Sequence, residues 1–327
     1  MIYLETDTRD PYENLAAEEV AFTALDPSES YLMLWQNDNT IVVGKFQNTA
    51  EEIDQEYVDA HGIRVARRLS GGGAVYHDAG NLNYTLIVDR KQFEDFNFRI
   101  FVEPVVRTLA RFGVQAECNG RNDVTIGGKK FSGSSQYAKG ERLLHHGCIM
   151  LDSDLSVVSR ALNVNRAKIE SKGIKSVSSR VTTVNANAPR PISMAAFKAA
   201  LTEEIFAGAP VRRHAFTERE RAQIETLRRE KYSTWDWNYG YCGNYALRRE
   251  KKFPAGLVTV HMNAEGGHIG DVRIRGDFFG NGDLAELESA MRGLALDEKL
   301  EAALEKLNVP HYISGVTAGD LAALLRY

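Results

Sequence analysis

The segment from Arg67 to Asp78 reads Arg-Arg-Leu-Ser-Gly-Gly-Gly-Ala-Val-Tyr-His-Asp. Three consecutive glycines weaken any helix or strand, but they let backbone N–H groups approach an anion closely. Arg68 could add a planar guanidinium that binds phosphate or carboxylate through two hydrogen bonds. A flexible turn between strands is the plainer interpretation, and the neighbouring Arg, His and Asp favour an anion site over it. The segment has neither the ending of a Walker A loop nor the spacing of a dinucleotide-binding loop.

A second polar cluster lies further along the chain, where Gly120-Arg121-Asn122-Asp123 is followed by Gly127-Gly128-Lys129-Lys130-Phe131-Ser132-Gly133-Ser134. Asn122 and Asp123 could cap a turn, or they could hold a magnesium ion or a ribose hydroxyl. Lys129 and Lys130 are neighbours at the start of a predicted strand, so their side chains point to opposite faces. One lysine can therefore reach into a cleft while the other stays in water.

Two further segments carry chemistry-bearing residues. In His145-His146-Gly147-Cys148 we expect one histidine to face solvent and the other the core, and Cys148 to be a small core residue, with a nucleophile as the alternative. The stretch Arg160–Arg180 has six basic residues against Glu170 alone. It is either a solvated basic loop or a loop that orders around phosphate oxygens.

Composition excludes several classes of protein. The chain has 327 residues, 43% of them apolar and 26% charged, as in folded globular proteins. The formal net charge of -4 argues against a general nucleic-acid binder. The cysteines are Cys118, Cys148 and Cys242, too sparse for a disulfide framework or a zinc site. The N-terminus does not resemble a signal peptide, and no apolar run reaches membrane-spanning length, so we expect a cytosolic protein.

The hydrophobic pattern predicts an α+β protein with a mixed, largely antiparallel sheet and packed helices, because most predicted strands are too close together for βαβ crossovers. A domain boundary is expected near residue 245, giving a domain of residues 1–245 and a small α+β domain of residues 246–327. The predicted strands are 31–35, 40–43, 63–66, 83–88, 114–117, 124–126, 131–137, 147–151, 256–262 and 268–274, and the predicted helices are 14–25, 50–60, 98–112, 155–162, 194–206, 218–231, 283–292, 297–307 and 317–325. We expect residues 67–73 to be a loop and 248–252 an exposed segment.

These motifs together resemble the lipoate–protein ligase A family of the biotin/lipoate ligase superfamily. The resemblance rests on the motifs at 67–78, 120–123, 130–134, 145–147 and 172–181, and also on Trp235-Asp236-Trp237-Asn238. It is strong over residues 10 to 245 and rests mainly on length and element order after that. It implies a catalytic domain that binds lipoate and ATP, followed by a C-terminal accessory domain. It also implies two steps, in which lipoate and MgATP form lipoyl-AMP and a protein lysine then displaces AMP.

The resemblance assigns roles to individual residues. Lys130 is implied to be catalytic, to contact the lipoyl carboxyl oxygen and the α-phosphate, and to stabilise the phosphorus transition state. The ATP- or adenylate-binding residues are implied to be Arg68, Gly73, Ala74, Val75, Tyr76, Asn122, Asp123 and Lys130, with Asp123 as the magnesium ligand. The lipoate-binding residues are implied to be Ser70, Gly71, Gly72, Val75, His77, Lys130 and His146. The loop that closes over the adenylate is implied to include Lys172, Lys175, Ser178 and Arg180.

The implied acceptors are lipoyl domains of 2-oxoacid dehydrogenase complexes (E2) and the glycine cleavage H protein. ATP with Mg²⁺ is the implied co-substrate, no tightly bound cofactor is expected, and we expect a monomer. The family often has Thr where this chain has Cys148. Related octanoyltransferases use a catalytic cysteine without ATP, so an acyltransferase acting through Cys148 stays open, as does a non-catalytic carrier of lipoate or lipoyl-AMP.

Overall fold

The computed structural model describes residues 1–93, 97–119, 122–162, 180–239 and 245–326. It divides into two compact units. Unit 1 consists of Met1–Val42, Ala50–Arg67 and Val75–Asn238, and unit 2 of Val43–Thr49, Arg68–Ala74 and Tyr239–Tyr327. Two short segments from the first quarter of the sequence, one of them within the glycine-rich motif, thus belong to the C-terminal unit.

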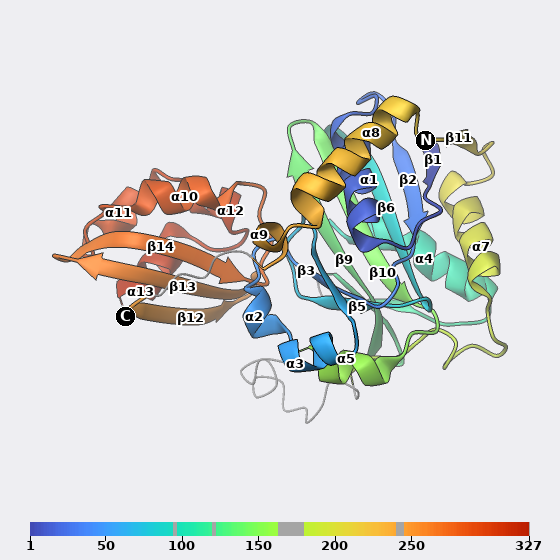
Figure 1. Cartoon of the computed structure of the whole chain (residues 1–327), viewed down its shortest axis with the longest axis horizontal. Coiled ribbons are helices and arrows are strands. Elements are labelled where there is room, and N and C mark those ends of the chain that lie inside the picture. The colour runs from blue at the N-terminus through green and yellow to red at the C-terminus, as the bar shows by residue number, and fades with distance from the viewer. Residues whose placement is uncertain (94–96, 120–121, 163–179, 240–244, 327) are drawn as a thin grey trace. The chain divides into compact units, whose positions relative to one another are not determined.

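Unit 1 is built on an eight-stranded sheet (Figure 1). Only the pairs β1–β2 and β1–β11 are parallel among its described strands; the others are antiparallel, which confirms the predicted mixed, largely antiparallel sheet. The strand order is β11 (Arg212–His214), β1 (Ile2–Glu5), β2 (Tyr31–Trp35), β6 (Asn81–Asp89), β10 (Arg142–Met150), β9 (Lys129–Lys139), β8 (Asp123–Ile126) and β7 (Glu117–Asn119).

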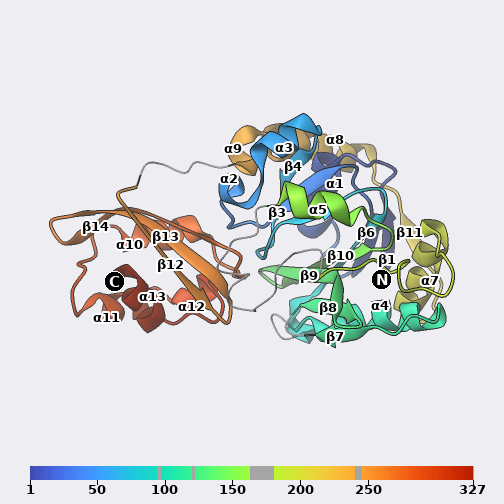
Figure 2. The same cartoon turned by 90° about the horizontal axis from the view of Figure 1, so that it is seen from below.

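Helices cover both faces of this sheet. One face packs on α1 (Pro11–Thr23), whose N-terminus is capped by Asp10, and on α8 (Glu218–Leu227). The other packs on α4 (Arg99–Arg111) and α7 (Met194–Phe206). Figure 2 shows α1 and α8 on the opposite side of the sheet from α4. The central strands are therefore buried on both faces, and β6 has eight consecutive buried residues.

Smaller elements complete unit 1. A three-stranded sheet has the order β4 (Arg64–Arg67), β3 (Thr40–Val43) and β5 (Val75–His77). The single helix predicted at 50–60 is two short ones, because Asp54 caps a new helix that begins at Gln55 by accepting from the N–H of Tyr57. The remaining elements are α2 (Thr49–Glu52), α3 (Gln55–Ala60), η1 (Arg90–Gln92), α5 (Leu155–Ala161), η2 (Arg228–Tyr232) and α9 (Trp235–Asn238).

Unit 2 has its own core between a three-stranded antiparallel sheet and several helices. The sheet consists of β12 (Leu247–Phe253), β13 (Gly256–Glu265) and β14 (His268–Gly276). The exposed segment expected at 248–252 is the middle of β12. The run of charged residues led to the expectation of an exposed segment instead of a strand. Charged side chains are nevertheless common on edge strands, because they discourage pairing with other chains. The helices are α10 (Leu284–Met291), α11 (Leu300–Glu305), α12 (Val309–Tyr312) and α13 (Ala318–Arg326).

Within the part of the chain that the structure describes, none of the helices combines the length and the apolar character needed to cross a membrane.

Candidate functional site

A β-bulge in β9 gives Lys130 its direction. Thr125 of β8 pairs with Lys130, but Val124 pairs with Ser132, so Phe131 is an extra residue in β9. Phe131 is fully buried in the core beneath α4 and α7. Asp123 and Thr125 are two residues apart and share a face, and their partners are Gly133 and Lys130. The bulge therefore places Lys130 and Gly133 on the same face although they are three residues apart.

The ammonium of Lys130 lies over Gly133. A Cβ added at Gly133 would come 2.8 Å from Nζ, closer than a Cβ packs against another heavy atom. Nζ pairs with Oδ1 of Asp123 at 2.7 Å, and the two side chains are 35% and 42% exposed. Glycine at 133 thus leaves the space that the lysine side chain occupies, and a solvent-accessible cation and anion lie side by side at this edge of the sheet.

Backbone hydrogen bonds hold a third charged residue, Arg180, beside Lys130. Lys130 N–H donates to the carbonyl of Arg180 at 2.8 Å, and Thr182 N–H donates to the carbonyl of Lys130 at 2.9 Å. In the Arg180 side chain, Nε and Nη2 are buried, and no acceptor among the described residues lies within hydrogen-bond reach of them. Buried donors of a cation are costly to leave unsatisfied, so Arg180 is suited to an anionic ligand.

Two neighbours of Lys130 have structural contacts of their own. The side-chain nitrogen of Asn122 donates to the carbonyl of Ser134 at 2.8 Å, which holds the start of β8 against β9. Cys148 lies opposite Gly133 in the ladder between β10 and β9, with its sulfur 3.8 Å from the Gly133 carbonyl oxygen. The thiol therefore lies on the same face as the Lys130 ammonium, in the adjacent strand.

The glycine-rich motif forms a loop in unit 2, and Arg68 braces it from inside. The guanidinium of Arg68 is buried; its Nη2 donates to the carbonyls of Gly71 and Gly73 at 2.8 and 2.9 Å, and its Nε donates to Oγ of Ser70 at 3.2 Å. These contacts fix the curvature of the loop. The phosphate contact expected of Arg68 stays a prediction.

Close backbone approach explains two of the three glycines. A Cβ at Gly71 would come 2.1 Å from the carbonyl oxygen of Phe278, and Gly72 has φ +94 and donates its N–H to the same carbonyl at 3.2 Å. Side chains at these positions would clash or be strained. At Gly73 an added Cβ would meet no described atom within 4 Å, so its glycine is not required by crowding.

The segment after the glycines forms β5 in unit 1. Ala74 precedes the strand, and Val75, Tyr76 and His77 pair with β3. The hydroxyl of Tyr76 donates to Asn39 at 3.0 Å, and burial raises the pKa of Tyr76 to about 12, so the phenol stays neutral. His77 is 3% exposed, and its Nδ1 faces the side-chain nitrogens of Asn37 and Asn83.

The two adjacent histidines are both buried, so the expectation that one faces solvent is wrong. Both faces of β10 are covered by helices, so alternation sends the two rings into two different cores. His145 stacks on Phe101 of α4, and burial together with the neighbouring His146 lowers the pKa of His145 well below 6.5. His146 pairs through Nδ1 with Oε1 of Glu18 in α1 at 2.8 Å.

Glu18 is a polar residue of this region that the sequence did not single out. It is fully buried, and the same Oε1 accepts from Thr85 at 2.6 Å, while Trp35 donates to Thr85 at 3.0 Å. The available signal was the pair Glu18-Glu19 within the otherwise apolar Leu15–Phe22 stretch of the predicted helix. A buried carboxylate needs partners, and His146 and Thr85 supply them at Oε1, whereas Oε2 is buried and has no hydrogen-bond partner among the described residues.

Some expected residues cannot be placed. Lys172, Lys175 and Ser178 of the expected adenylate loop lie outside the described residues, as do Gly120 and Arg121. In the described ranges, no cluster of three or more His, Cys, Asp or Glu residues could hold a metal ion. Mg²⁺ often binds through one carboxylate together with substrate phosphates, so Asp123 remains compatible with an ion that arrives with the nucleotide.

Family models match most of the chain. Residues 10–206 match the lipoyl protein ligase A/B catalytic domain, and residues 243–325 match the bacterial lipoate protein ligase C-terminus. The chain is 43% identical to lipoate–protein ligase 1 of Staphylococcus aureus, with 97% of each sequence covered. It is 40% identical to the lipoate-protein ligase LplJ of Bacillus subtilis, covering 99% of this chain and 100% of LplJ.

Solved structures agree with these matches. LipL1 of P. falciparum in complex with lipoate has the same fold, with a TM-score of 0.80, 23% identity, and coverage of 99% of this chain and 98% of LipL1. A bipartite lipoate protein ligase of Thermoplasma acidophilum, studied with its E2 lipoyl domain, gives 0.65 at 30% identity over 75% of this chain and 98% of that one. Lipoate-protein ligase A bound with ATP gives 0.62 at 28% identity over 73% and 97%.

The bulged strand that directs Lys130, the glycine-rich loop and the two matched domains converge on one assignment, and the chain belongs to the lipoate–protein ligase family.

Proposed function

We propose that the protein joins lipoate to protein lysines in two half-reactions. In the first, a lipoate carboxylate oxygen attacks the α-phosphorus of MgATP, forming lipoyl-AMP and releasing pyrophosphate. In the second, the ε-amine of a lysine attacks the acyl carbon, the bond to AMP breaks, and the amine loses a proton as the amide forms. Adenylation is needed because a carboxylate is a poor electrophile and AMP is a good leaving group.

The observation that carries the proposal is the position of the Lys130 ammonium, held on one face of the sheet by a bulge and accommodated by Gly133. Lipoate and ATP are both anionic, so a cation must offset their repulsion where they meet. Each charge-assisted hydrogen bond from such a group is worth about 1.5–3 kcal/mol. Lys130 would move from Asp123 to the lipoyl carboxyl oxygen and the α-phosphate as the reactants bind.

Arg180 and Asp123 complete the proposed charge arrangement around Lys130. The buried guanidinium nitrogens of Arg180 would gain phosphate oxygens as partners, which lowers the energy of the bound state. Asp123, released from Lys130, would hold the magnesium ion of MgATP, and Asn122 would help to position the nucleotide. The basic loop that contains Lys172, Lys175 and Ser178 would close over the adenylate.

The glycine-rich segment would bind both substrates. Arg68, Gly73, Ala74, Val75 and Tyr76 would contact ATP or the adenylate, in part through backbone N–H groups. The lipoyl group would lie along Ser70, Gly71, Gly72, Val75, His77, Lys130 and His146. Its tail has about four methylenes, and burying them contributes about 3 kcal/mol at ~0.8 kcal/mol for each. An apolar slot therefore selects for the tail, whereas the cations select for the carboxylate.

We propose E2 lipoyl domains and the glycine cleavage H protein as acceptors, which the Thermoplasma ligase studied with its E2 lipoyl domain supports for the first class. We also propose that the enzyme acts as a monomer in the cytosol, with a domain boundary near residue 245. The family match that begins at residue 243 supports this boundary.

The deciding experiment measures pyrophosphate release by the full-length protein with lipoate, octanoate and biotin in parallel. We expect ATP-dependent release with lipoate, little with biotin, and multiple turnovers when an apo lipoyl domain is added. Binding of lipoate without turnover would identify a carrier instead. Release that is equally fast without any carboxylic acid would show an unrelated ATPase and overturn the proposal.

A further inference from the structure

Two asparagine side chains contact the imidazole of His77. Its Nδ1 is 3.2 Å from Nδ2 of Asn37 and 3.4 Å from Nδ2 of Asn83. In a neutral imidazole, one ring nitrogen carries a proton and the other accepts, and the partner of one nitrogen decides which is which. The protonation of His77 can therefore be worked out if the amide of Asn37 can be oriented.

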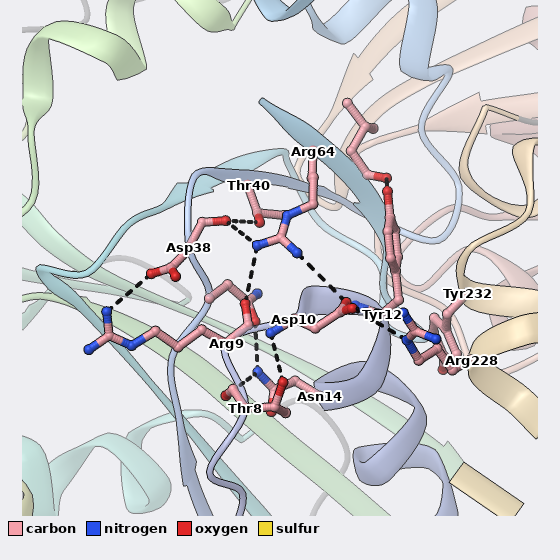
Figure 3. A network of polar contacts seen from close by, with 12 residues as sticks. Thr8, Arg9, Asp10, Tyr12, Asn14, Asp38, Thr40, Arg64, Arg228 and Tyr232 are labelled. Atoms are coloured by element: carbon pink, nitrogen blue, oxygen red, sulfur yellow. Dashed lines mark hydrogen bonds and ion pairs between the residues drawn. The ribbon is translucent and has the colours of Figure 1, made fainter. Parts of the chain in front are cut away.

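Asn14 fixes that orientation. Its side-chain nitrogen contacts two backbone carbonyl oxygens, of Thr8 at 3.3 Å and of Gln36 at 2.9 Å; Figure 3 shows the contact with Thr8. Carbonyl oxygens only accept, so the atom facing them must be the amide nitrogen. The Asn14 oxygen accepts from the hydroxyl of Thr6 at 2.6 Å, which agrees. Asn14 is fully buried, and these contacts hold its amide in one orientation.

The oriented amide of Asn14 determines the orientation of the Asn37 amide. The nitrogen of Asn14 lies 3.0 Å from a side-chain atom of Asn37, which must accept and is therefore Oδ1. The other end of the Asn37 amide is then Nδ2, and it donates to Nδ1 of His77. Asn83 is consistent with this order, because its Oδ1 accepts from Asn81 at 3.0 Å and its Nδ2 faces the same ring nitrogen.

We infer that His77 is held as the neutral tautomer with its proton on Nε2, and that Asn37 and Asn14 are positioning residues that hold it there. A proton on Nδ1 would face the Asn37 N–H at 3.2 Å inside the protein, where two opposed donors are costly. Both the Nδ1–H tautomer and the imidazolium are disfavoured for this reason. His77 therefore contributes an uncharged hydrogen-bond donor, Nε2–H, and no positive charge.

This inference deepens the proposed function. The tautomer itself is independent of that function, but the role of Nε2–H toward substrate rests on it. Lys130 and Arg180 would supply the charge that anions require, whereas a neutral donor is suited to an uncharged part of the reaction, the acyl oxygen of the adenylate or the lipoyl group. His77 would thus orient the lipoyl moiety through Nε2–H without attracting a phosphate to the part of the slot that binds the lipoyl group.

The direct test is nuclear magnetic resonance of the full chain labelled with ¹⁵N in its eight histidines. We expect one histidine, assigned by the loss of its signals in a His77→Gln variant, to show a protonated Nε2 and an unprotonated Nδ1 at pH 7. A proton on Nδ1, or on both nitrogens, would overturn the inference. This measurement needs no substrate, so its outcome does not depend on the proposed function.

An Asn37→Asp variant replaces the donor that faces Nδ1 of His77 by an acceptor of nearly the same shape. A carboxylate can only accept at neutral pH, so we expect Nδ1 of His77 to gain a proton. Asn263→Asp is the matched control, since it adds the same charge in unit 2 and keeps the oxygen that accepts from the N–H of Ala246. The control should leave the His77 spectrum unchanged. An Asn37→Asp spectrum identical to that of the parent would show that Asn37 does not set the tautomer.

The use of Nε2–H is tested by adding saturating lipoate to a preparation that releases pyrophosphate with lipoate and ATP. We expect the signals of Nε2 and its proton to shift more than that of Nδ1. In such an active preparation, an unchanged His77 spectrum would remove His77 from the lipoyl slot, while the pyrophosphate result would leave the proposed ligase activity standing.

Discussion

The ammonium nitrogen of Lys130 lies 2.7 Å from Oδ1 of Asp123, in a pair that is only partly buried. Partly exposed ion pairs contribute about 0–1 kcal/mol to stability, so this contact is easily exchanged. Lys130→Ala should therefore change the free energy of unfolding by less than about 1 kcal/mol. Loss of one preorganised transition-state contact typically costs about 10²–10³ in rate, which we expect for lipoate-dependent pyrophosphate release. A near-normal rate in a folded variant would show that Lys130 is not the catalytic cation.

Gly133→Ala tests the same site without removing a charge. The added Cβ would lie 2.8 Å from Nζ of Lys130, and no other described atom comes nearer than Lys130 Cε at 2.9 Å. Because the end of a flexible side chain can move aside, the variant should fold normally. The ammonium would be displaced from its position, and we expect pyrophosphate release to fall at least tenfold, about the effect of a 1.4 kcal/mol loss. Gly127→Ala does not serve as a control, because Gly127 has a positive φ that disfavours alanine.

A suitable comparison for Gly133→Ala is Ser135→Ala, two residues further along β9, which adds no volume. If Gly133→Ala and Ser135→Ala were both as active as the parent protein, the space above Gly133 would not matter for the position of Lys130. If instead Gly133→Ala lost both activity and stability, the backbone rather than the lysine would have moved, and the rate could not be attributed to Lys130.

The sequence was sufficient for the long periodic elements, and its motifs supplied the residues of the proposed site, which stay predictions. The helix predicted at 194–206 has those bounds in the structure, because its apolar spacing and its Ser193 cap are local signals. The strand β12 was missed because its charges hide an edge position that only sheet pairing reveals. The bulge at Phe131 was equally invisible, since it is defined by register with β8. Glu18 was missed because its partners, His146 and Thr85, are distant in sequence.

Cys148→Ser separates the ligase from an acyltransferase that forms a thioester. The sulfur of Cys148 lies on the same face as Lys130. Among the described residues, its hydrogen-bond partner is the Gly133 carbonyl oxygen, at 3.8 Å. A ligase that transfers from an adenylate needs no thiol, so we expect the variant to retain pyrophosphate release and lysine modification. Loss of both activities, together with a trappable acyl-thioester in the parent protein without ATP, would favour the acyltransferase.

His145 should make the protein sensitive to mild acid. Burial lowers its pKa in the folded state well below 6.5, so below about pH 6.5 the unfolded chain binds a proton that the native protein does not. Stability from this residue is therefore complete above that pH and falls as the pH decreases, by up to about 1.4 kcal/mol for each unit. The effect ends when the pH reaches the folded-state pKa. Urea denaturation at pH 7.5 and 5.5 would measure the difference.

The matched variant for this prediction is His145→Phe. A phenyl ring can replace the imidazole that stacks on Phe101. Gln136 and Tyr84 lie 3.1 and 3.4 Å from the imidazole nitrogens, and in the variant they keep their other partners, the carbonyl of Asn97 and the hydroxyl of Ser134. The variant should lose less stability than the parent between the two pH values, because it has no proton to bind at this position. Parallel losses in the two proteins would mean that His145 is protonated in the native state as well.

The pair of Glu18 and His146 should be more important for stability than any exposed ion pair of the chain. Glu18 is fully buried, and its Oε1 is the acceptor for both His146, at 2.8 Å, and Thr85, at 2.6 Å. Glu18→Ala would leave both donors without this acceptor and would open a cavity, and breaking a buried pair in this way typically costs about 3–5 kcal/mol. Glu18→Gln keeps the volume and an oxygen that can accept from the same donors, so a loss of about 1 kcal/mol is expected. Urea denaturation of both variants at pH 7.5 distinguishes the two effects. Equal losses would show that a neutral amide cannot replace the carboxylate, because the glutamine keeps the volume and one acceptor but loses the charge and adds N–H donors where Oε2 has no partner among the described residues.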